Sequence, residues 1–141
     1  MAHNVASIKA LVEAMKHDLP QWNRAAKRTL ILATSREKDA GGMLKPLVES
    51  FDEIILTKYQ DNPRGKSEKE LLKIARSIQK QLSAANKHAA NLSTQPNPDS
   101  AWSHVSTGMT KEDFVCISGS AFLVAELRKT ILDSAKSPAS L

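Results

Sequence analysis

Hydrophobic positions along this chain follow two alternating patterns. Three short runs are mainly apolar, which is typical of strands buried on both faces of a parallel sheet. Between these runs, apolar residues recur every three or four positions, which is the spacing of an amphipathic helix. The pattern predicts strands at 29–34, 53–58 and 113–118, with a weaker strand within 88–94. It predicts helices at 5–19, from Gly41 onward, from Ser67 onward, at 99–107 and at 120–133.

Residues at the boundaries support these assignments. Pro20 is expected to end the first helix, because proline cannot continue the hydrogen bonding of a helix interior. Ser67 and Glu70 match a capping box, in which both residues satisfy backbone groups at a helix start. Strands that alternate with helices indicate an α/β fold: a Rossmann-like, mostly parallel sheet with helices on both faces. We expect one such domain over residues 1–133 and a flexible tail over 134–141.

The composition is that of an ordinary globular domain. With 141 residues, 41% hydrophobic and 25% charged, the chain is long enough for one domain with a substantial core. No apolar run approaches the roughly 20 residues that cross a bilayer, and the N-terminus does not have the pattern of a secretory signal. The single cysteine, Cys116, excludes an internal disulfide and is expected to be a buried hydrophobe. We therefore expect a cytoplasmic protein without membrane contact.

The charge balance is basic but dispersed. Twenty Lys and Arg residues exceed fifteen Asp and Glu residues, which gives a net charge of +5. The cations are interleaved with acids, as in residues 66–70 (KSEKE), and only 4% of residues are aromatic, so platforms for stacking bases are scarce. These features argue against a nucleic-acid partner. An interaction domain whose basic surface binds an acidic partner stays open as an alternative.

Candidate chemistry lies in the segments that follow the strands, because ligands of open α/β sheets bind at the carboxyl ends of the strands. Three polar segments that contain glycine leave strand ends at 35–42, 59–65 and 118–120. Lys38 lies just before a helix start, where an anion is favoured. Asp39 beside it has the alternative role of capping that helix. We expect a binding site for a carboxylate or a phosphate where these segments meet.

The other candidates also have ordinary structural explanations. Arg64 can present its guanidinium to a carboxylate or phosphate, or it can be a solvated turn residue. Ser118, Gly119 and Ser120 allow a ligand to approach closely, or they form an ordinary strand-to-helix turn. The chain contains neither a G-x-G-x-x-G motif nor a P-loop, and its four histidines do not have metal-ligand spacing. We therefore predict no metal site on this chain.

Four segments, in order, resemble motifs of one enzyme family. Residues 2–4 (AHN) are similar to the end of a D-G-A-H-N motif, and residues 33–39 (ATSREKD) to a strand and loop that end in D-K-D, with glutamate in place of the first aspartate. Residues 62–65 (NPRG) resemble a P-R-A turn, and residues 115–127 a closing motif that contains G-S-x-x-L-V-x-E-L. Together they resemble the C-terminal domain of folylpolyglutamate synthase and dihydrofolate synthase, in the Mur ligase superfamily, over nearly the whole chain.

This resemblance implies a role in folate biosynthesis and one-carbon metabolism. The family joins the carboxyl group of a folate or dihydropteroate, activated by ATP as an acyl phosphate, to the amino group of glutamate. Its C-terminal domain closes over the site as a lid that helps to bind ATP and the incoming amino acid. The resemblance assigns the nucleotide side to His3 and Asn4, the amino-acid or phosphate side to Lys38, Asp39 and Arg64, and the strand-end loop to Ser118, Gly119 and Ser120. It implies no catalytic residue and no metal ligand on this chain.

The same resemblance implies partners beyond this chain. ATP and Mg²⁺ are expected in the full-length enzyme, and neither is expected to bind this chain tightly. The expected partner is a P-loop ATPase domain on the N-terminal side, with folate or dihydropteroate and glutamate as substrates and the protein a monomer. Because the aspartate and the strand that precede His3 in the family are missing, we expect a domain of a longer ligase that is inactive alone. The alternative is a stand-alone Rossmann-like module that binds a small molecule or nucleotide.

Overall fold

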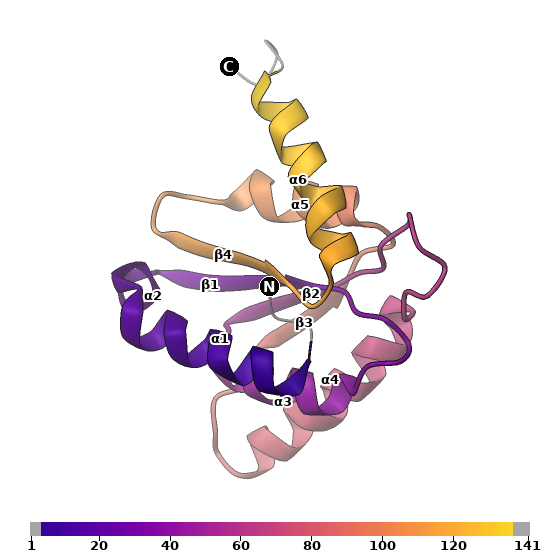
Figure 1. The fold of residues 1–141 in the computed structure, drawn as a ribbon. Helices are drawn as coiled ribbons and strands as arrows, with labels where there is room; N and C mark the ends of the chain where they lie inside the picture. Colours follow the sequence, from indigo (N-terminus) through magenta and orange to yellow (C-terminus); the bar gives the residue numbers. More distant parts are fainter. Residues whose placement is uncertain (1–3, 137–141) are drawn as a thin grey trace.

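The computed structural model describes residues 4–136 as one sheet between two layers of helices (Figure 1). The elements in chain order are α1 (Val5–Asp18), α2 (Pro20–Arg24), β1 (Lys27–Leu32), α3 (Ala40–Ser50), β2 (Glu53–Leu56), α4 (Glu68–Ala84), β3 (Asn91–Thr94), α5 (Pro98–Gly108), β4 (Asp113–Ser118) and α6 (Ala121–Lys136). Strands therefore alternate with helices as the sequence predicts.

All strand pairings in the sheet are parallel, and the strands lie in the order β3-β2-β1-β4. The two central strands are predicted apolar runs: the last four residues of β1 and the last three of β2 are buried. In the register of the sheet, Leu30 lies opposite Ile54 of β2 and Cys116 of β4. The predicted α/β fold with a parallel sheet is confirmed. Because all four strands run the same way, their carboxyl ends meet at one edge.

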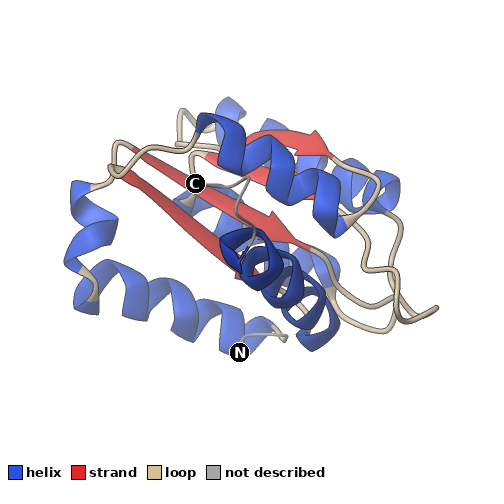
Figure 2. Cartoon of the chain, turned by 90° about the horizontal axis from the view of Figure 1, so that it is seen from above, coloured by secondary structure: helices blue, strands red, loops and turns tan. Residues whose placement is uncertain are grey.

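Helices cover both faces of the sheet (Figure 2), and each face has its own hydrophobic cluster. On one face α1, α3 and α4 pack against Leu30, Leu32 and Ile54. On the other face α5 and α6 pack against Ile31 and Ile55. Successive side chains of a strand point to opposite faces, so the central strands contribute to both clusters. Each fully buried aliphatic side chain contributes about 1.5–3 kcal/mol, and this burial holds the two helix layers on the sheet.

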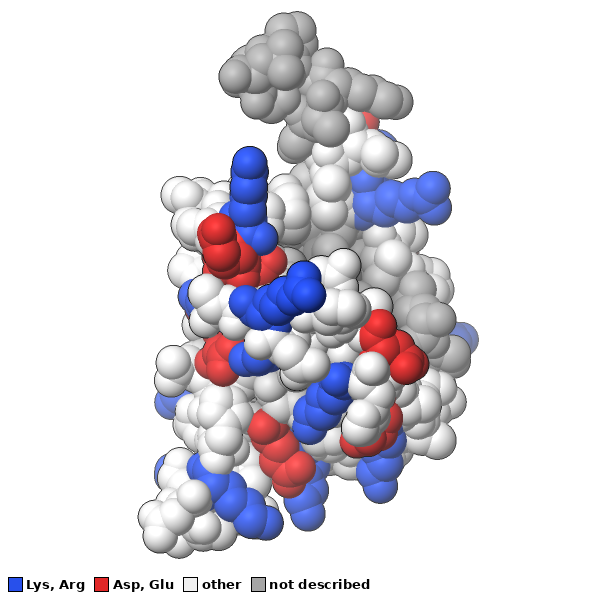
Figure 3. Space-filling model, turned by 90° about the vertical axis from the view of Figure 1, so that its left-hand side faces the viewer, with Lys and Arg blue, Asp and Glu red and all other residues white. Residues whose placement is uncertain are grey.

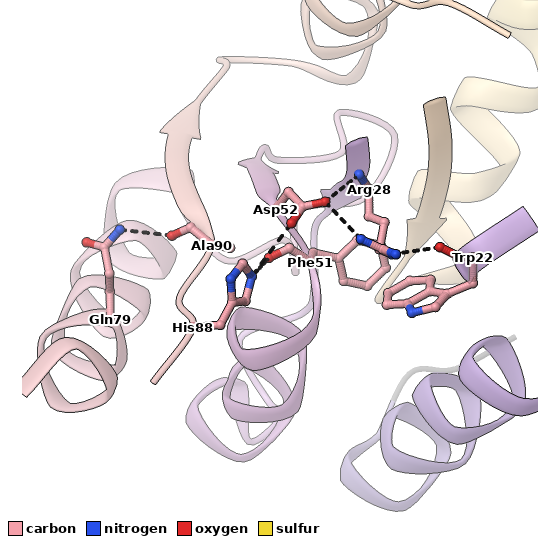
Figure 4. Close-up of polar contacts among 7 residues, drawn as sticks. All are labelled: Trp22, Arg28, Phe51, Asp52, Gln79, His88 and Ala90. Atoms are coloured by element: carbon pink, nitrogen blue, oxygen red, sulfur yellow. Dashed lines mark hydrogen bonds and ion pairs between the residues drawn. The ribbon is translucent and has the colours of Figure 1, made fainter. Parts of the chain in front are cut away.

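A polar cluster closes the edge of the sheet at which the strands begin (Figure 4). Asp52 Oδ2 accepts a hydrogen bond from the backbone N–H of Arg28 at 2.8 Å. The Arg28 guanidinium donates from Nε to the Trp22 carbonyl oxygen at 2.8 Å and lies 5.1 Å from the centre of the Trp22 ring. His88 Nε2 donates to the Phe51 carbonyl oxygen at 2.8 Å. These contacts join segments far apart in sequence, at the edge opposite the predicted site.

Two boundaries in the first third of the chain differ from the sequence-based expectation. Pro20 does follow the end of α1, but it also begins α2, a short helix that the hydrophobic pattern did not predict. Its fixed φ suits the first helical position, where no N–H is needed. β1 spans 27–32 rather than the predicted 29–34. Lys27 and Arg28 already pair with β4, and the pairing ends at Leu32.

Two later boundaries are also refined by the structure. Ser67 caps α4 as predicted, but its hydroxyl accepts the N–H of Lys69 at 3.2 Å rather than that of Glu70. α6 continues to Lys136, so the first three residues of the expected tail are helical; residues 137–141 lie outside the described part. None of the described helices is long and apolar enough to span a membrane.

Candidate functional site

Two of the three predicted segments are joined at the carboxyl edge of the sheet. The loop after β1 and the loop after β2 form an antiparallel bridge between Ser35 and Gly65. Beside this bridge, the Lys66 N–H donates to the Thr34 carbonyl oxygen at 2.8 Å. Backbone groups that are paired in this way resist separation, so the two loops form one unit.

The third segment reaches the first through Gly119, which connects β4 to α6. Its φ of +104° is a conformation that favours glycine. A Cβ atom at this position would lie 2.4 Å from the Ala33 carbonyl oxygen and 2.5 Å from Leu32 Cδ1. The turn therefore packs directly on the end of β1, an approach that only glycine allows. Ser120 follows as the cap of α6, and its Oγ accepts the N–H of Phe122 at 3.1 Å.

A pocket of about 170 Å³ opens where these segments meet. Each of the three segments contributes to its walls, which are Ser35, Lys38, Tyr59, Gly119, Ser120, Ala121 and Phe122. Lys38 is the charged residue of this lining. Sites that enclose a whole small-molecule ligand measure roughly 300–1,000 Å³. The pocket therefore suits a carboxylate or a phosphate group rather than a complete nucleotide.

Tyr59 is the largest buried side chain of this pocket. It is 1% exposed, and its ring centre lies 5.4 Å from that of Phe122. Its hydroxyl makes no hydrogen bond of acceptable geometry with the described residues. Burial raises the pKa of the Tyr59 phenol above its ordinary value, and the nearby Ser120 side chain lowers it by less. A buried polar group without a partner is costly, so the Tyr59 hydroxyl is an unsatisfied donor beside the pocket.

A carboxylate from α6 holds the loop after β2. Glu126 Oε1 accepts the backbone N–H of Gln60 at 2.6 Å and that of Asp61 at 2.8 Å. One charged oxygen thus binds two adjacent amides, and hydrogen bonds of this charge-assisted kind are among the stronger ones. The contact fixes the position of Tyr59 relative to the helix that carries Phe122, and both rings line the pocket.

The described residues also include potential metal ligands and one thiol, Cys116. Over residues 4–136, no group of three His, Cys, Asp or Glu side chains is placed to hold a metal ion. The pocket lining contains one amine and several hydroxyls but none of the carboxylates that Mg²⁺ prefers. Burial raises the pKa of the Cys116 thiol to about 11, so its nucleophilic thiolate is scarce at neutral pH. Cys116 was expected to be buried, but it is only half-buried in β4, where it packs against the hydrophobic cluster.

The sequence matches the family "Dihydrofolate synthetase, C-terminal domain" over residues 1–132. The chain belongs to this family. The match spans nearly the whole chain, confirms the resemblance carried by the four motifs, and favours a ligase domain over a stand-alone binding module. No curated protein is significantly similar in sequence.

Solved structures share the fold of this dihydrofolate synthetase C-terminal domain at low sequence identity. The match with Escherichia coli FolC in complex with ADP covers 97% of this chain and 29% of the FolC chain, with 22% identity and a TM-score of 0.77. A bifunctional folylpolyglutamate synthase/dihydrofolate synthase from Yersinia pestis, complexed with AMPPNP and Mn ion, matches 94% and 27%, with 22% identity and a TM-score of 0.72. Mycobacterium tuberculosis folylpolyglutamate synthase complexed with ADP matches 92% and 28%, with 22% identity and a TM-score of 0.65. The chain therefore spans less than a third of the length of each.

The structure brings three of the predicted site residues together in this domain. Lys38, Gly119 and Ser120 all line the pocket. Ser118 is 2% exposed at the end of β4 and is not part of the lining. Arg64 also lies outside the lining. Its Nε is 3.6 Å from Glu37 Oε1, and 68% of its side chain is exposed.

The remaining predicted residues have local roles in the described part of the chain. Asp39 Oδ1 accepts the N–H of Gly42 at 3.0 Å and caps α3. Helix capping is the role that the sequence offered as the alternative to ligand binding. Asn4 Oδ1 accepts the N–H of Ser7 at 2.8 Å and caps α1. Contact of either residue with a ligand stays a prediction. His3 lies outside the described residues.

Three residues that build the site were not predicted from the sequence. Tyr59 opens one of the three predicted segments and Phe122 lies just after another, so their positions beside strand ends were the available signal. Glu126 had no such signal, because its two partners lie 65 and 66 positions earlier in the chain. Only the packing of α6 beside the loop after β2 shows that contact.

Proposed function

We propose that this domain is the lid of an ATP-dependent ligase that joins glutamate to dihydropteroate or to a folate. The observation that carries the proposal is the convergence of Lys38 with the turn after β4 in one pocket, in a member of this family. Solved relatives hold ADP, or AMPPNP with manganese, which supports ATP and a divalent metal in the complete enzyme. The pocket residues lack metal-binding carboxylates, so the metal belongs to the rest of that enzyme.

Each pocket residue has a role in this proposal that follows from its chemistry. Lys38 binds a carboxylate of the incoming glutamate or a phosphate oxygen, because its ammonium is the charged group of the lining. The hydroxyls of Ser120 and Tyr59 donate hydrogen bonds to the same anion. Arg64, which pairs with Glu37 outside the lining, contributes only its positive charge to this region. Closure of such a lid excludes water from a hydrolysable acyl phosphate and orients the attacking amine.

A chimera tests the proposal. This chain replaces the corresponding C-terminal part of Escherichia coli FolC, and dihydrofolate formation from dihydropteroate, glutamate and ATP is measured. We expect activity from the chimera and none from this chain alone, because the chain contains no P-loop. A folded chimera that forms no product contradicts the proposal. The isotope-labelled chain alone gives a second measurement: ADP or glutamate should shift the amide signals of Ser35, Lys38 and Ser120.

Lys38→Ala in the chimera tests the pocket itself. A charge-assisted contact to a group in the transition state contributes about 2–4 kcal/mol, so the rate should fall by about two to three decades. Lys111→Ala is the matched control, because Lys111 is exposed in the turn before β4, at the opposite edge of the sheet. Its rate should be unchanged. A near-normal rate for Lys38→Ala would remove Lys38 from the site.

A further inference from the structure

Four basic side chains form a row along the outer surface of α4. They are Lys69, Lys73, Arg76 and Lys80, and all four are exposed. At about 100° and 1.5 Å per residue, the spacing of four, three and four positions confines them to an arc of about 60° over about 16 Å. Together with Leu72 and Ser77, they line a groove of about 420 Å³. We call these four residues the α4 basic row.

The α4 basic row forms no ion pair in the described part of the chain, although Glu68 and Glu70 lie in the first turn of the same helix. None of its four members lies within 4 Å of an acidic group there, whereas Lys27 pairs with Glu53 and Arg28 with Asp52. At the end of the molecule where the strands begin, acidic and basic side chains are intermixed (Figure 3). Like charges three or four positions apart on a helix repel each other. An uncompensated row therefore costs stability unless a partner neutralises it.

The fold itself does not require these cations. α4 packs through Leu71, Ala75 and Leu82, which are buried on its inner side. The helix lies on the face of the sheet opposite α5 and α6 (Figure 1), so the row is separate from the pocket described above. Without the row, the net charge would fall from +5 to +1. With Glu68 and Glu70 in its first turn, α4 as a whole has a net charge of +2.

We propose that the α4 basic row is a docking surface for an acidic polypeptide segment. The cations repeat every 4.5–6 Å along the helix axis, about the spacing of carboxylates three or four positions apart on a helix or on alternate residues of a strand. The half-buried Leu72 provides apolar contact beside the charges. The groove has no aromatic side chain on which a base could stack. Nor does it have the broad apolar face that inserts into a bilayer.

Fluorescence anisotropy tests this assignment on the whole chain. The probe is a labelled peptide with glutamates at i, i+4 spacing, measured at low and at physiological salt. The row variant carries Lys69→Gln, Lys73→Gln, Arg76→Gln and Lys80→Gln. The control variant has the same net charge and carries Lys9→Gln, Lys16→Gln, Arg24→Gln and Lys111→Gln, at exposed positions on other elements. Circular dichroism verifies that both variants are folded.

The row variant should bind the peptide at least about tenfold more weakly than the unmodified chain, because several exposed ion pairs are lost together. The control variant should stay within about twofold, and higher salt should weaken binding to the unmodified chain. Three results would overturn the proposal. They are no peptide binding at low salt, an equal loss in both variants, and tighter binding of single-stranded RNA or of phosphatidylserine vesicles than of the peptide.

Discussion

Replacement of Glu126 by alanine should release the loop after β2 from α6. Its single oxygen accepts two backbone amides, at 2.6 and 2.8 Å. A hydrogen bond to a charged group contributes about 1.5–3 kcal/mol in a typical case. Because this contact is exposed to solvent, we discount each bond to about 0.5–1 kcal/mol. In the variant, the loop position that Glu126 holds should therefore be about 1–2 kcal/mol less stable relative to positions in which the two amides are free.

Amide hydrogen exchange measures this loss at the two residues concerned. In Glu126→Ala, the amides of Gln60 and Asp61 should exchange about 5–30 times faster, the factor that corresponds to one or two kcal/mol. Glu126→Gln keeps an acceptor oxygen but not the charge, so its effect should be smaller. Glu49→Ala removes an exposed helical carboxylate from α3 and should leave both amides unchanged.

Two outcomes would refute this reasoning. One is unchanged exchange at both amides in Glu126→Ala while α6 remains helical. The other is acceleration that spreads evenly over the whole sheet, which would indicate general destabilisation. In the FolC chimera, Glu126→Ala should raise the KM for glutamate more than it lowers kcat, because the loop carries Tyr59 into the pocket.

Three further predictions concern the frame around the site. Gly119→Ala should destabilise the domain by about 3 kcal/mol or more in urea unfolding, because its φ is +104° and its Cβ would lie 2.4 Å from the Ala33 carbonyl oxygen. Burial raises the pKa of Cys116 from 9.0 to about 11. The unfolded chain therefore loses this proton first, stability should fall by up to about 2–3 kcal/mol from pH 9 to pH 11, and Cys116→Ala should remove that part of the decline. Asp52→Ala should lower the free energy of unfolding, measured by thermal denaturation, by about 1–2 kcal/mol, because the Arg28 contacts are lost. Asp52→Asn should lower it by less.

The central strands could be predicted from sequence because their burial leaves a local mark. Residues 30–32 and 54–56 are apolar in succession, and they form the buried parts of β1 and β2. α2 was missed because five residues are too few for a periodic pattern. The early start of β1 was missed because Lys27 and Arg28 look solvated, whereas they pair with β4. Such pairing depends on residues more than eighty positions away.

The site could be predicted in outline but not in detail. Parallel strands bring their carboxyl ends together, so the convergence of Lys38 with Gly119 and Ser120 followed from the strand pattern. The roles of individual side chains depend on tertiary contacts instead. Tyr59 packs in the hydrophobic cluster beneath α5 and α6, Glu126 holds the two residues that follow it, and Arg64 pairs with Glu37.

The strand order also affects when the pocket can form during folding. β1, β2 and β3 pair with their neighbours in the chain, each across one intervening helix. β4 pairs with β1 only after the chain has crossed the whole sheet, and this pairing joins positions 27 and 113. Closing so long a segment costs entropy that local pairing does not. We therefore expect β1 to β3 to assemble first, both on the ribosome and in refolding. The turn at Gly119 and the helix behind it then complete the pocket in the last step.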